Sequence, residues 1–127
     1  MKIKLMGILT MLCSLLGCNA QDGFKSLSVE EYAKSIEDTM VVRLDVRSAE
    51  EYADGHIANT LNIDVLKSDF EKKALATLPK EKTIAVNCRG GKRSKNAARI
   101  LVKNGYKVIE LDAGYNGWIR EGKPIVK

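Results

Sequence analysis

Apolar and polar positions change their spacing along the chain, and the changes predict strands that alternate with helices. Met40–Val46 and Thr83–Asn87 are short apolar runs, rich in β-branched residues and bounded by turn-forming residues, which is typical of buried strands. Lys107–Leu111 has the same character, and Leu61–Val65 predicts a further short strand. Strands buried on both faces are characteristic of parallel sheets, so the pattern favours an α/β fold.

Helices are predicted between these strands from capping residues and apolar spacing. Two capping boxes, in which a serine stands three residues before a glutamate, begin at Ser28 and Ser48. The predicted helices cover residues 29–37, 48–55, 69–78, 94–104 and 114–121. A helix between successive strands indicates βαβ units, and therefore a mainly parallel central sheet with helices on both faces.

The length and composition of the chain allow a single domain. It has 127 residues, of which 45% are hydrophobic and 29% are charged, a composition that can build a globular core. We find no internal repeat and no low-complexity tract. We predict a signal-like segment over residues 1–17, a modified terminus and linker over 18–26, and one α/β domain over 27–127.

The first residues have the character of an export signal. Lys2 and Lys4 precede an apolar run at residues 5–17, and this run is shorter than the roughly 20 residues that a membrane-spanning helix needs. The sequence LLGC at residues 15–18 resembles the lipobox of bacterial lipoproteins, in which the cysteine is lipidated and becomes the new N-terminus. The resemblance implies a protein outside the cytoplasm, held to a bacterial membrane by a lipid on Cys18. The alternative is an ordinary cleaved signal.

Removal of this segment changes both the charge and the cysteine content. The chain has 21 basic and 16 acidic residues, and loss of Lys2 and Lys4 leaves an excess of about three basic residues. That excess is too small to indicate a nucleic-acid partner. Cys13 leaves with the signal and Cys18 carries the lipid, so Cys88 is the one free thiol and no intramolecular disulfide is expected.

Cys88 comes directly after a predicted strand, where ligand sites of open α/β sheets gather. Gly90 and Gly91 let the backbone curl into an anion-binding nest, and the start of the next helix adds further N–H groups. Cations surround the thiol in the sequence, at Arg89, Lys92, Arg93, Lys95 and Arg99. These surroundings favour the thiolate, so Cys88 is predicted to be a nucleophile whose substrate is a small anion. A structural cysteine would instead have apolar neighbours.

Several motifs, in their order and spacing, resemble the rhodanese family of sulfurtransferases over essentially the whole predicted domain. They are LDVR at 44–47, EEY at 50–52, GHI at 55–57, CRGGKRS at 88–94, LDAG at 111–114 and GW at 117–118. In that family the cysteine takes the outer sulfur of a donor such as thiosulfate, becomes a persulfide and passes the sulfur to cyanide or a thiol. The resemblance implies no metal and no organic cofactor.

The resemblance also assigns roles to the loop. Cys88 would be the nucleophile, and the residues that bind the anionic donor would be Arg89, Gly90, Gly91, Lys92, Arg93 and Ser94. Two features depart from the family pattern. Ala113 stands where a glycine is usual, and the chain has one domain where the best-known thiosulfate sulfurtransferases have two, which leaves the natural donor open.

Three other functions fit the loop less well. A rhodanese-like docking module without catalysis usually lacks the cysteine. Phosphatases and arsenate reductases of related fold place an arginine six residues after the cysteine, whereas this chain has Arg93 five residues after it and Ser94 at the sixth position. A nucleotide-binding P-loop would need Ser or Thr at position 93 and Gly at position 86, which hold Arg and Val.

The remaining polar and aromatic residues are predicted to be structural. Asp45 and Arg47 stand at a strand end, where they could line the pocket, but we expect them to form an ion pair that supports the loop. His56 is the only histidine, and we expect it to form hydrogen bonds near the end of the sheet rather than to bind a metal or pair with the cysteine. Trp118 is expected in the core.

Overall fold

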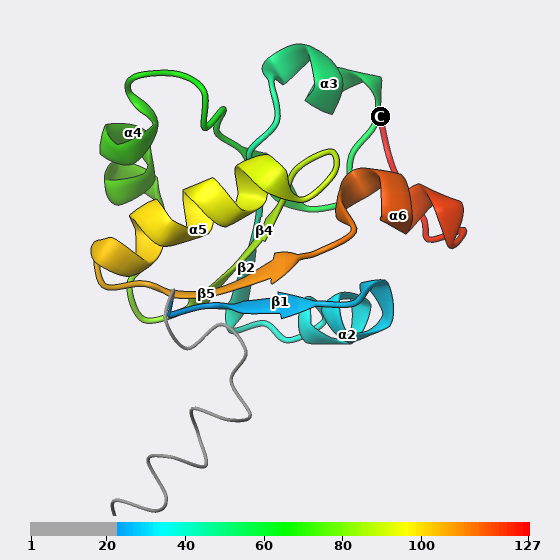
Figure 1. Cartoon of the computed structure of the whole chain (residues 1–127), viewed down its shortest axis with the longest axis horizontal. Coiled ribbons are helices and arrows are strands. Elements are labelled where there is room, and N and C mark those ends of the chain that lie inside the picture. Colours follow the sequence, from blue (N-terminus) through cyan, green and yellow to red (C-terminus); the bar gives the residue numbers. More distant parts are fainter. Residues whose placement is uncertain (1–22) are drawn as a thin grey trace, which may run out of the picture.

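A five-stranded, entirely parallel sheet forms the centre of the molecule. The computed structural model describes residues 23–127 (Figure 1). The strands are β1 (Lys25–Leu27), β2 (Val41–Asp45), β3 (Thr60–Asn62), β4 (Thr83–Asn87) and β5 (Lys107–Leu111). They lie in the order β1-β5-β4-β2-β3, and every neighbouring pair is parallel. The predicted α/β class and parallel sheet are confirmed.

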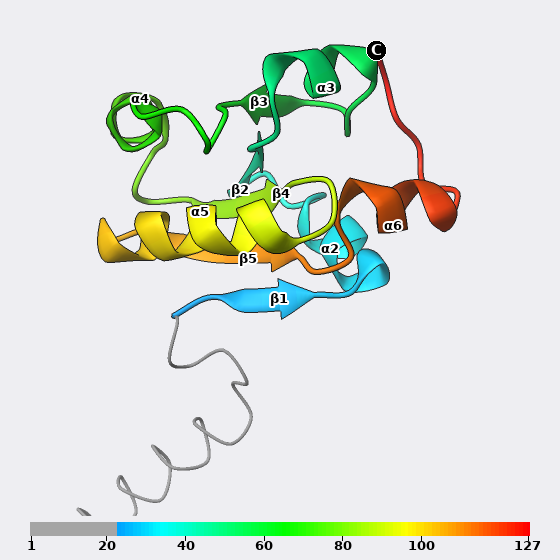
Figure 2. The same cartoon turned by 45° about the horizontal axis from the view of Figure 1, so that its top comes forward.

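Helices cover both faces of this sheet, as predicted. They are α2 (Val29–Ser35), α3 (Ala49–Asp54), α4 (Phe70–Thr77), α5 (Lys92–Lys103) and α6 (Gly114–Arg120). One buried cluster joins α4 and α5 to the sheet, and a second joins α2 and α6 to its other face (Figure 2). The helix α3 contributes no buried residue and lies beyond the end of the sheet.

The central strand β4 explains why the sequence has uninterrupted apolar runs. Successive side chains of a strand point to opposite faces. Ile84 and Val86 therefore join the cluster under α4 and α5, while Ala85 joins the cluster under α2 and α6. All three are fully buried, so the strand has no solvent-facing side that would require polar residues.

The strand order reverses its direction between β4 and β2. From β4 the chain crosses through α5 to β5, whereas from β2 it turns the other way, through α3 to β3. The loops that follow β2 and β4 therefore diverge between two neighbouring strands. Ligands of open α/β sheets bind at such a point, and Cys88 lies there.

Several element boundaries differ from the prediction. Lys25 and Ser26, which we expected in a linker, belong to β1, because pairing with β5 makes this short polar segment a strand. β3 ends at Asn62 rather than continuing to residue 65. The helix α5 begins at Lys92 instead of residue 94, since Gly91 caps it in the left-handed conformation and no side chain is needed.

Within the described residues, no helix is long and apolar enough to cross a membrane. The predicted signal segment and Cys18 lie outside the described residues.

Candidate active site

Cys88 lies at the carboxyl end of β4, with its side chain almost completely buried. The backbone N–H of Gly91 donates a hydrogen bond to its Sγ atom at 3.0 Å. The hydroxyl oxygen of Ser94 is 3.5 Å from the same sulfur. The loop thus curls around the thiol as the glycines predict, and an N–H at the start of α5 points at the atom where negative charge would develop.

The two tight turns of this site depend on glycines that have no room for a side chain. Gly91 has a φ of 105°, and a Cβ there would lie 2.2 Å from the carbonyl oxygen of Asp112. Gly114 has a φ of 67°, and its Cβ would lie 2.3 Å from the carbonyl oxygen of Arg89. Only glycine adopts such backbone angles without strain, so the loop after β4 and the turn after β5 fit together closely.

The helix α6 fixes the backbone of the loop from the other side. Its first N–H groups are directed at the loop carbonyls: Tyr115 donates to Cys88 at 2.7 Å, and Asn116 donates to Arg89 at 3.0 Å. Ala113, which replaces the glycine usual in the resembling motif, has an ordinary φ of −80°. The substitution therefore costs no backbone strain next to the site.

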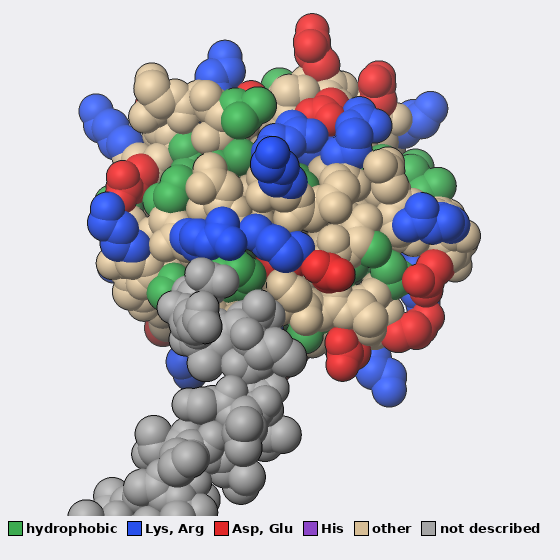
Figure 3. All heavy atoms as spheres, in the orientation of Figure 1, with side chains coloured by type: hydrophobic (Ala, Val, Ile, Leu, Met, Phe, Trp, Pro, Cys, Tyr) green, Lys and Arg blue, Asp and Glu red, His purple; other side chains and the backbone are tan. Residues whose placement is uncertain are grey.

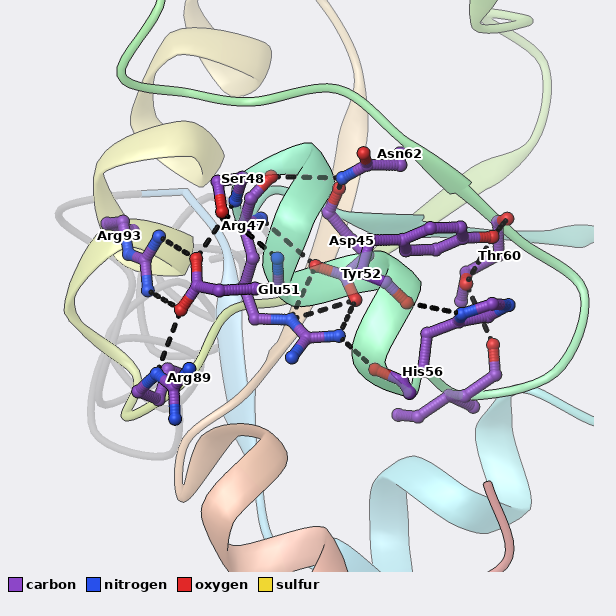
Figure 4. A network of polar contacts seen from close by, with 12 residues as sticks. Asp45, Arg47, Ser48, Glu51, Tyr52, His56, Thr60, Asn62, Arg89 and Arg93 are labelled. Carbon is purple, nitrogen blue, oxygen red and sulfur yellow. Dashed lines mark hydrogen bonds and ion pairs between the residues drawn. The ribbon is translucent and has the colours of Figure 1, made fainter. Parts of the chain in front are cut away.

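The arginines of the loop are paired with an acidic residue from a distant part of the chain (Figure 4). Glu51 of α3 accepts hydrogen bonds from both Arg93 Nη atoms, at 2.8 and 3.0 Å, and from Arg89 Nε at 2.8 Å. The Arg93 guanidinium, then the Ser48 backbone N–H and Arg89, hold the pKa of Glu51 well below its usual value. In turn, the Glu51 carboxylate raises the pKa of Arg93, and the nearby Cys88 adds to this effect.

Two further cations of the loop region differ in their surroundings. Lys92 is exposed at the start of α5. Lys95 is partly buried, with its Nζ atom 2.7 Å from Asp112 Oδ1 and 3.0 Å from Glu110 Oε1. Lys and Arg side chains spread over the face on which α5 lies (Figure 3), but the sulfur itself is covered by the loop.

Glu110 is a second acidic residue bound to the loop, and no sequence motif connects it with Cys88. It lies on β5, is fully buried, and its Oε2 accepts a hydrogen bond from Ser94 Oγ at 2.6 Å. Its other oxygen accepts from Ser26 Oγ as well as from Lys95. Ser94 therefore lies between a carboxylate and the sulfur of Cys88.

The predicted ion pair between Asp45 and Arg47 forms and is almost completely buried. The shortest of its contacts joins Arg47 Nη2 to Asp45 Oδ2 at 2.7 Å. Nη2 also donates to the carbonyl of Gly55 at 2.8 Å, and the guanidinium lies 4.0 Å from the centre of the Tyr115 ring. The pair thus connects the end of β2 with α6, whose Tyr115 binds the Cys88 carbonyl, so it supports the loop from behind.

His56 and Trp118 have the structural surroundings that we expected. The Nδ1 atom of His56 is 2.8 Å from the Tyr52 carbonyl oxygen, and its ring stacks on the Tyr52 ring. Trp118 packs edge-to-face against Tyr32 and donates to the carbonyl of Pro124 at 2.8 Å. Among residues 23–127, no group of three or more His, Cys, Asp or Glu side chains could hold a metal ion.

Comparison with known proteins agrees with the observed fold. Residues 28–121 match the family described as Rhodanese-like domain. The chain belongs to this family. The rhodanese-like match begins just after β1, so that strand and its Ser26 lie outside the matched region.

Several rhodanese-like relatives are similar over most of their length. The chain is 34% identical to the putative sulfurtransferase YtwF of Bacillus subtilis, over 79% of this chain and 95% of the relative. It is 33% identical to the thiosulfate sulfurtransferase GlpE of Coxiella burnetii, over 75% of this chain and 87% of the relative. A rhodanese-related protein from Thermoplasma volcanium superposes with a TM-score of 0.72 at 31% identity, covering 81% and 98% of the two chains.

Proposed function

We propose that this rhodanese-like protein is a sulfurtransferase that carries sulfur on Cys88 as a persulfide. The position of the Cys88 sulfur carries the proposal: it lies at the start of α5, 3.0 Å from the Gly91 nitrogen, inside a loop closed by two tight glycine turns. Relatives named as sulfurtransferases support the same activity.

In the proposed reaction the Cys88 thiolate attacks the outer sulfur of an anionic donor such as thiosulfate. The sulfur–sulfur bond of the donor breaks, sulfite leaves with the electron pair, and Cys88 becomes a persulfide. Cyanide or an acceptor thiolate then attacks the terminal sulfur, which restores the Cys88 thiolate. The Gly91 N–H and the neighbouring helix start stabilise negative charge on the sulfur in each step. The exposed Lys92 is available to attract the anionic donor to the loop.

The length of the loop favours sulfur transfer over phosphate chemistry. Arg93 is five residues after Cys88 and lies in the first turn of α5. Both of its Nη atoms are bound to Glu51, so its paired donors are directed at a carboxylate of the same chain. A phosphatase uses such a pair of donors to hold phosphate.

The decisive measurement is the mass of the intact protein after treatment with thiosulfate. The wild-type chain should gain the mass of one sulfur atom, and cyanide should remove it. The Cys88→Ser variant should gain nothing, whereas a Cys13→Ser and Cys18→Ser double variant should behave as wild type. A wild-type protein that stays unmodified by thiosulfate and by other persulfide donors would instead indicate a docking module. Hydrolysis of an aryl phosphate would indicate a phosphatase.

The proposal extends to the place where the protein works. We infer from the lipobox at residues 15–18 that Cys18 carries a lipid, which anchors the domain to a bacterial membrane outside the cytoplasm. Its partners would then be small molecules, an anionic sulfur donor and a thiol or cyanide acceptor, together with the membrane itself.

A further inference from the structure

Glu110 is a fully buried carboxylate that has no part in the proposed steps of sulfur transfer. It lies on β5, and its Oε1 accepts hydrogen bonds from Ser26 and from Lys95 Nζ, the latter at 3.0 Å. Its Oε2 accepts from Ser94 Oγ at 2.6 Å. Burial of a carboxylate lowers stability unless partners of this kind compensate for the lost water. The partners connect it with the reactive loop.

Ser94 is the direct connection between Glu110 and the thiol. Its oxygen lies 2.6 Å from Glu110 Oε2, 3.1 Å from the Gly91 carbonyl oxygen and 3.5 Å from Cys88 Sγ. A hydroxyl has one proton to donate. A carboxylate at this distance forms a charge-assisted hydrogen bond, which is about twice as strong as one to a neutral acceptor. The Ser94 proton therefore points at Glu110, and only lone pairs of the oxygen face the sulfur.

We infer that Glu110 is a positioning residue for Cys88 and acts through Ser94. By accepting the hydrogen bond of the Ser94 hydroxyl, Glu110 leaves the lone pairs of the Ser94 oxygen to accept from the Cys88 S–H group and so stabilises the thiol against the thiolate. Without the carboxylate, Ser94 would turn its proton toward the sulfur and stabilise the thiolate instead. This role of Glu110 concerns the ionisation of Cys88 and does not require that Cys88 forms a persulfide. Only its benefit to a sulfurtransferase rests on the proposed function.

Two opposing influences then set the reactivity of the sulfur. The Gly91 N–H, which donates to Sγ at 3.0 Å, and the start of α5 favour the thiolate. The connection from Glu110 through Ser94 favours the thiol. A cysteine restrained in this way reacts more slowly with oxidants, because the thiolate is the form that they attack. Such protection suits a free thiol in a protein proposed to work outside the cytoplasm.

Other charged groups around the loop come from each neighbouring element, and most of them are paired. Those that face it are Glu51 of α3, Asp64 after β3, Arg89, Lys92, Arg93 and Lys95, the Asp45–Arg47 pair, Glu110 and Asp112. Of the acidic residues in this set, Glu110 is the one whose carboxylate binds Ser94. This distinguishes it from Asp112, which also binds Lys95 but is 63% exposed.

The inference is tested by the pH dependence of Cys88 alkylation in the full chain carrying Cys13→Ser and Cys18→Ser, so that one thiol remains. Iodoacetamide is the probe, and detergent keeps the apolar leader in solution. In Glu110→Gln the amide N–H donates to Ser94, which frees the Ser94 proton for the sulfur. The midpoint of the alkylation curve should fall by about one pH unit. The matched control, Asp112→Asn, should leave the midpoint nearly unchanged.

A Ser94→Ala background separates the hydrogen-bonded connection from the charge alone. There, Glu110→Gln should move the midpoint by less than half as much. A midpoint that stays in place or rises in Glu110→Gln, or an equal shift in both backgrounds, would overturn the inference. Alkylation needs no sulfur donor, so these outcomes are independent of whether Cys88 forms a persulfide.

Circular dichroism shows whether Glu110→Gln folds. If it does not, a spectroscopic measurement on other proteins tests the inference. The S–H stretching band of Cys88, recorded below the alkylation midpoint, should lie at lower frequency in the otherwise unchanged protein than in Ser94→Ala. A thiol that donates to an oxygen has a weaker S–H bond, and Ser94→Ala removes that oxygen. Equal frequencies in the two proteins would contradict the inference.

Discussion

At the scale of single residues, Gly91 shows how backbone geometry places a reactive sulfur. Its N–H reaches Cys88 Sγ at 3.0 Å only because its backbone turns through a φ of 105°. The same turn brings its Cα so close to the Asp112 carbonyl that no larger residue fits. One position therefore provides the donor, the turn and the start of α5.

Replacing Gly91 with alanine should lower the free energy of unfolding by about 1–3 kcal/mol from backbone strain alone, with a further loss from the close contact. Gly90→Ala is the matched control, since its Cβ would have no atom within 4 Å. It should change stability by less than about 0.5 kcal/mol. Urea denaturation of the two variants compares them directly, and equal losses would show that the left-handed turn at Gly91 is not required.

The chemistry of this loop could be predicted from the sequence in part. The loop consists of neighbouring residues: Cys88, its glycines and the start of the next helix. One short segment therefore determines its local geometry. The acidic partners are not local. Glu51 is 38 residues from Arg89, and Glu110 is 16 residues from Ser94. In the sequence, the capping box at Ser48 already explains Glu51. Glu110 is a single charged residue in an apolar strand, and this unusual position is the only feature of the sequence that indicates a special role for it.

At the scale of elements, α3 is held to the molecule mainly by polar contacts, beside the stacking of its Tyr52 ring on His56. It buries no residue, and Glu51 joins it to the loop arginines. Tyr52 Oη adds a hydrogen bond to the Thr60 carbonyl at 2.5 Å. A helix without an apolar face against the core depends on such contacts for its position, and it is expected to open more readily than α5.

Glu51→Gln should therefore lower the free energy of unfolding at pH 7 by about 1 kcal/mol, allowing for the partial exposure of the ion pairs. The Arg93 guanidinium, foremost among its partners, holds the pKa of Glu51 below the usual 4.5, so the folded protein keeps this carboxylate ionised where the unfolded chain is protonated. Its contribution is complete above about pH 4.5 and is lost as the pH falls further.

Urea denaturation of wild type and Glu51→Gln across this pH range measures the effect. The stability difference between them should shrink below pH 4.5. Glu50→Gln, at the exposed neighbouring position of the same helix, should show no such convergence. A difference between wild type and Glu51→Gln that is the same at pH 7 and at low pH would contradict the assigned role.

Hydrophobic patterns in the sequence predict the central strands but not the edge strand β1. The runs at β2, β4 and β5 are apolar because they are buried on two faces, and they were predicted nearly to their ends. β1 has the sequence KSL, with no apolar pattern to identify it. It is a strand because β5 offers a free edge, which is a property of the assembled sheet.

At the scale of the whole molecule, the sheet has two short edge strands, and the loops around Cys88 lie at its carboxyl end. β1 and β3, the edge strands, have three residues each, which limits pairing with other chains. The loops that follow β2, β4 and β5 lie at the carboxyl end of the sheet and bring Arg47, Cys88 and Asp112 to that end.

The proposed lipid anchor is tested with the intact chain in a bacterial host. The wild-type protein should fractionate with membranes, and Cys18→Ser should move to the soluble fraction or remain as an uncleaved precursor. Cys13→Ser, within the apolar run, is the control and should fractionate as wild type. Identical fractionation of all three proteins without lipid on the peptide that contains Cys18 would exclude the anchor.

The parallel arrangement of the strands has a consequence for orientation. The described chain enters at the start of β1, and all strands point the same way, so Cys88 lies at the far end from that entry point. Only residues 19–22 separate Cys18 from Gly23, a span of at most about 18 Å when extended. In an anchored molecule the amino ends of the strands would face the bilayer, and the loop that covers Cys88 would face away from it. Small donors and acceptors would then arrive from solution, and the bilayer would not shield the thiol from them.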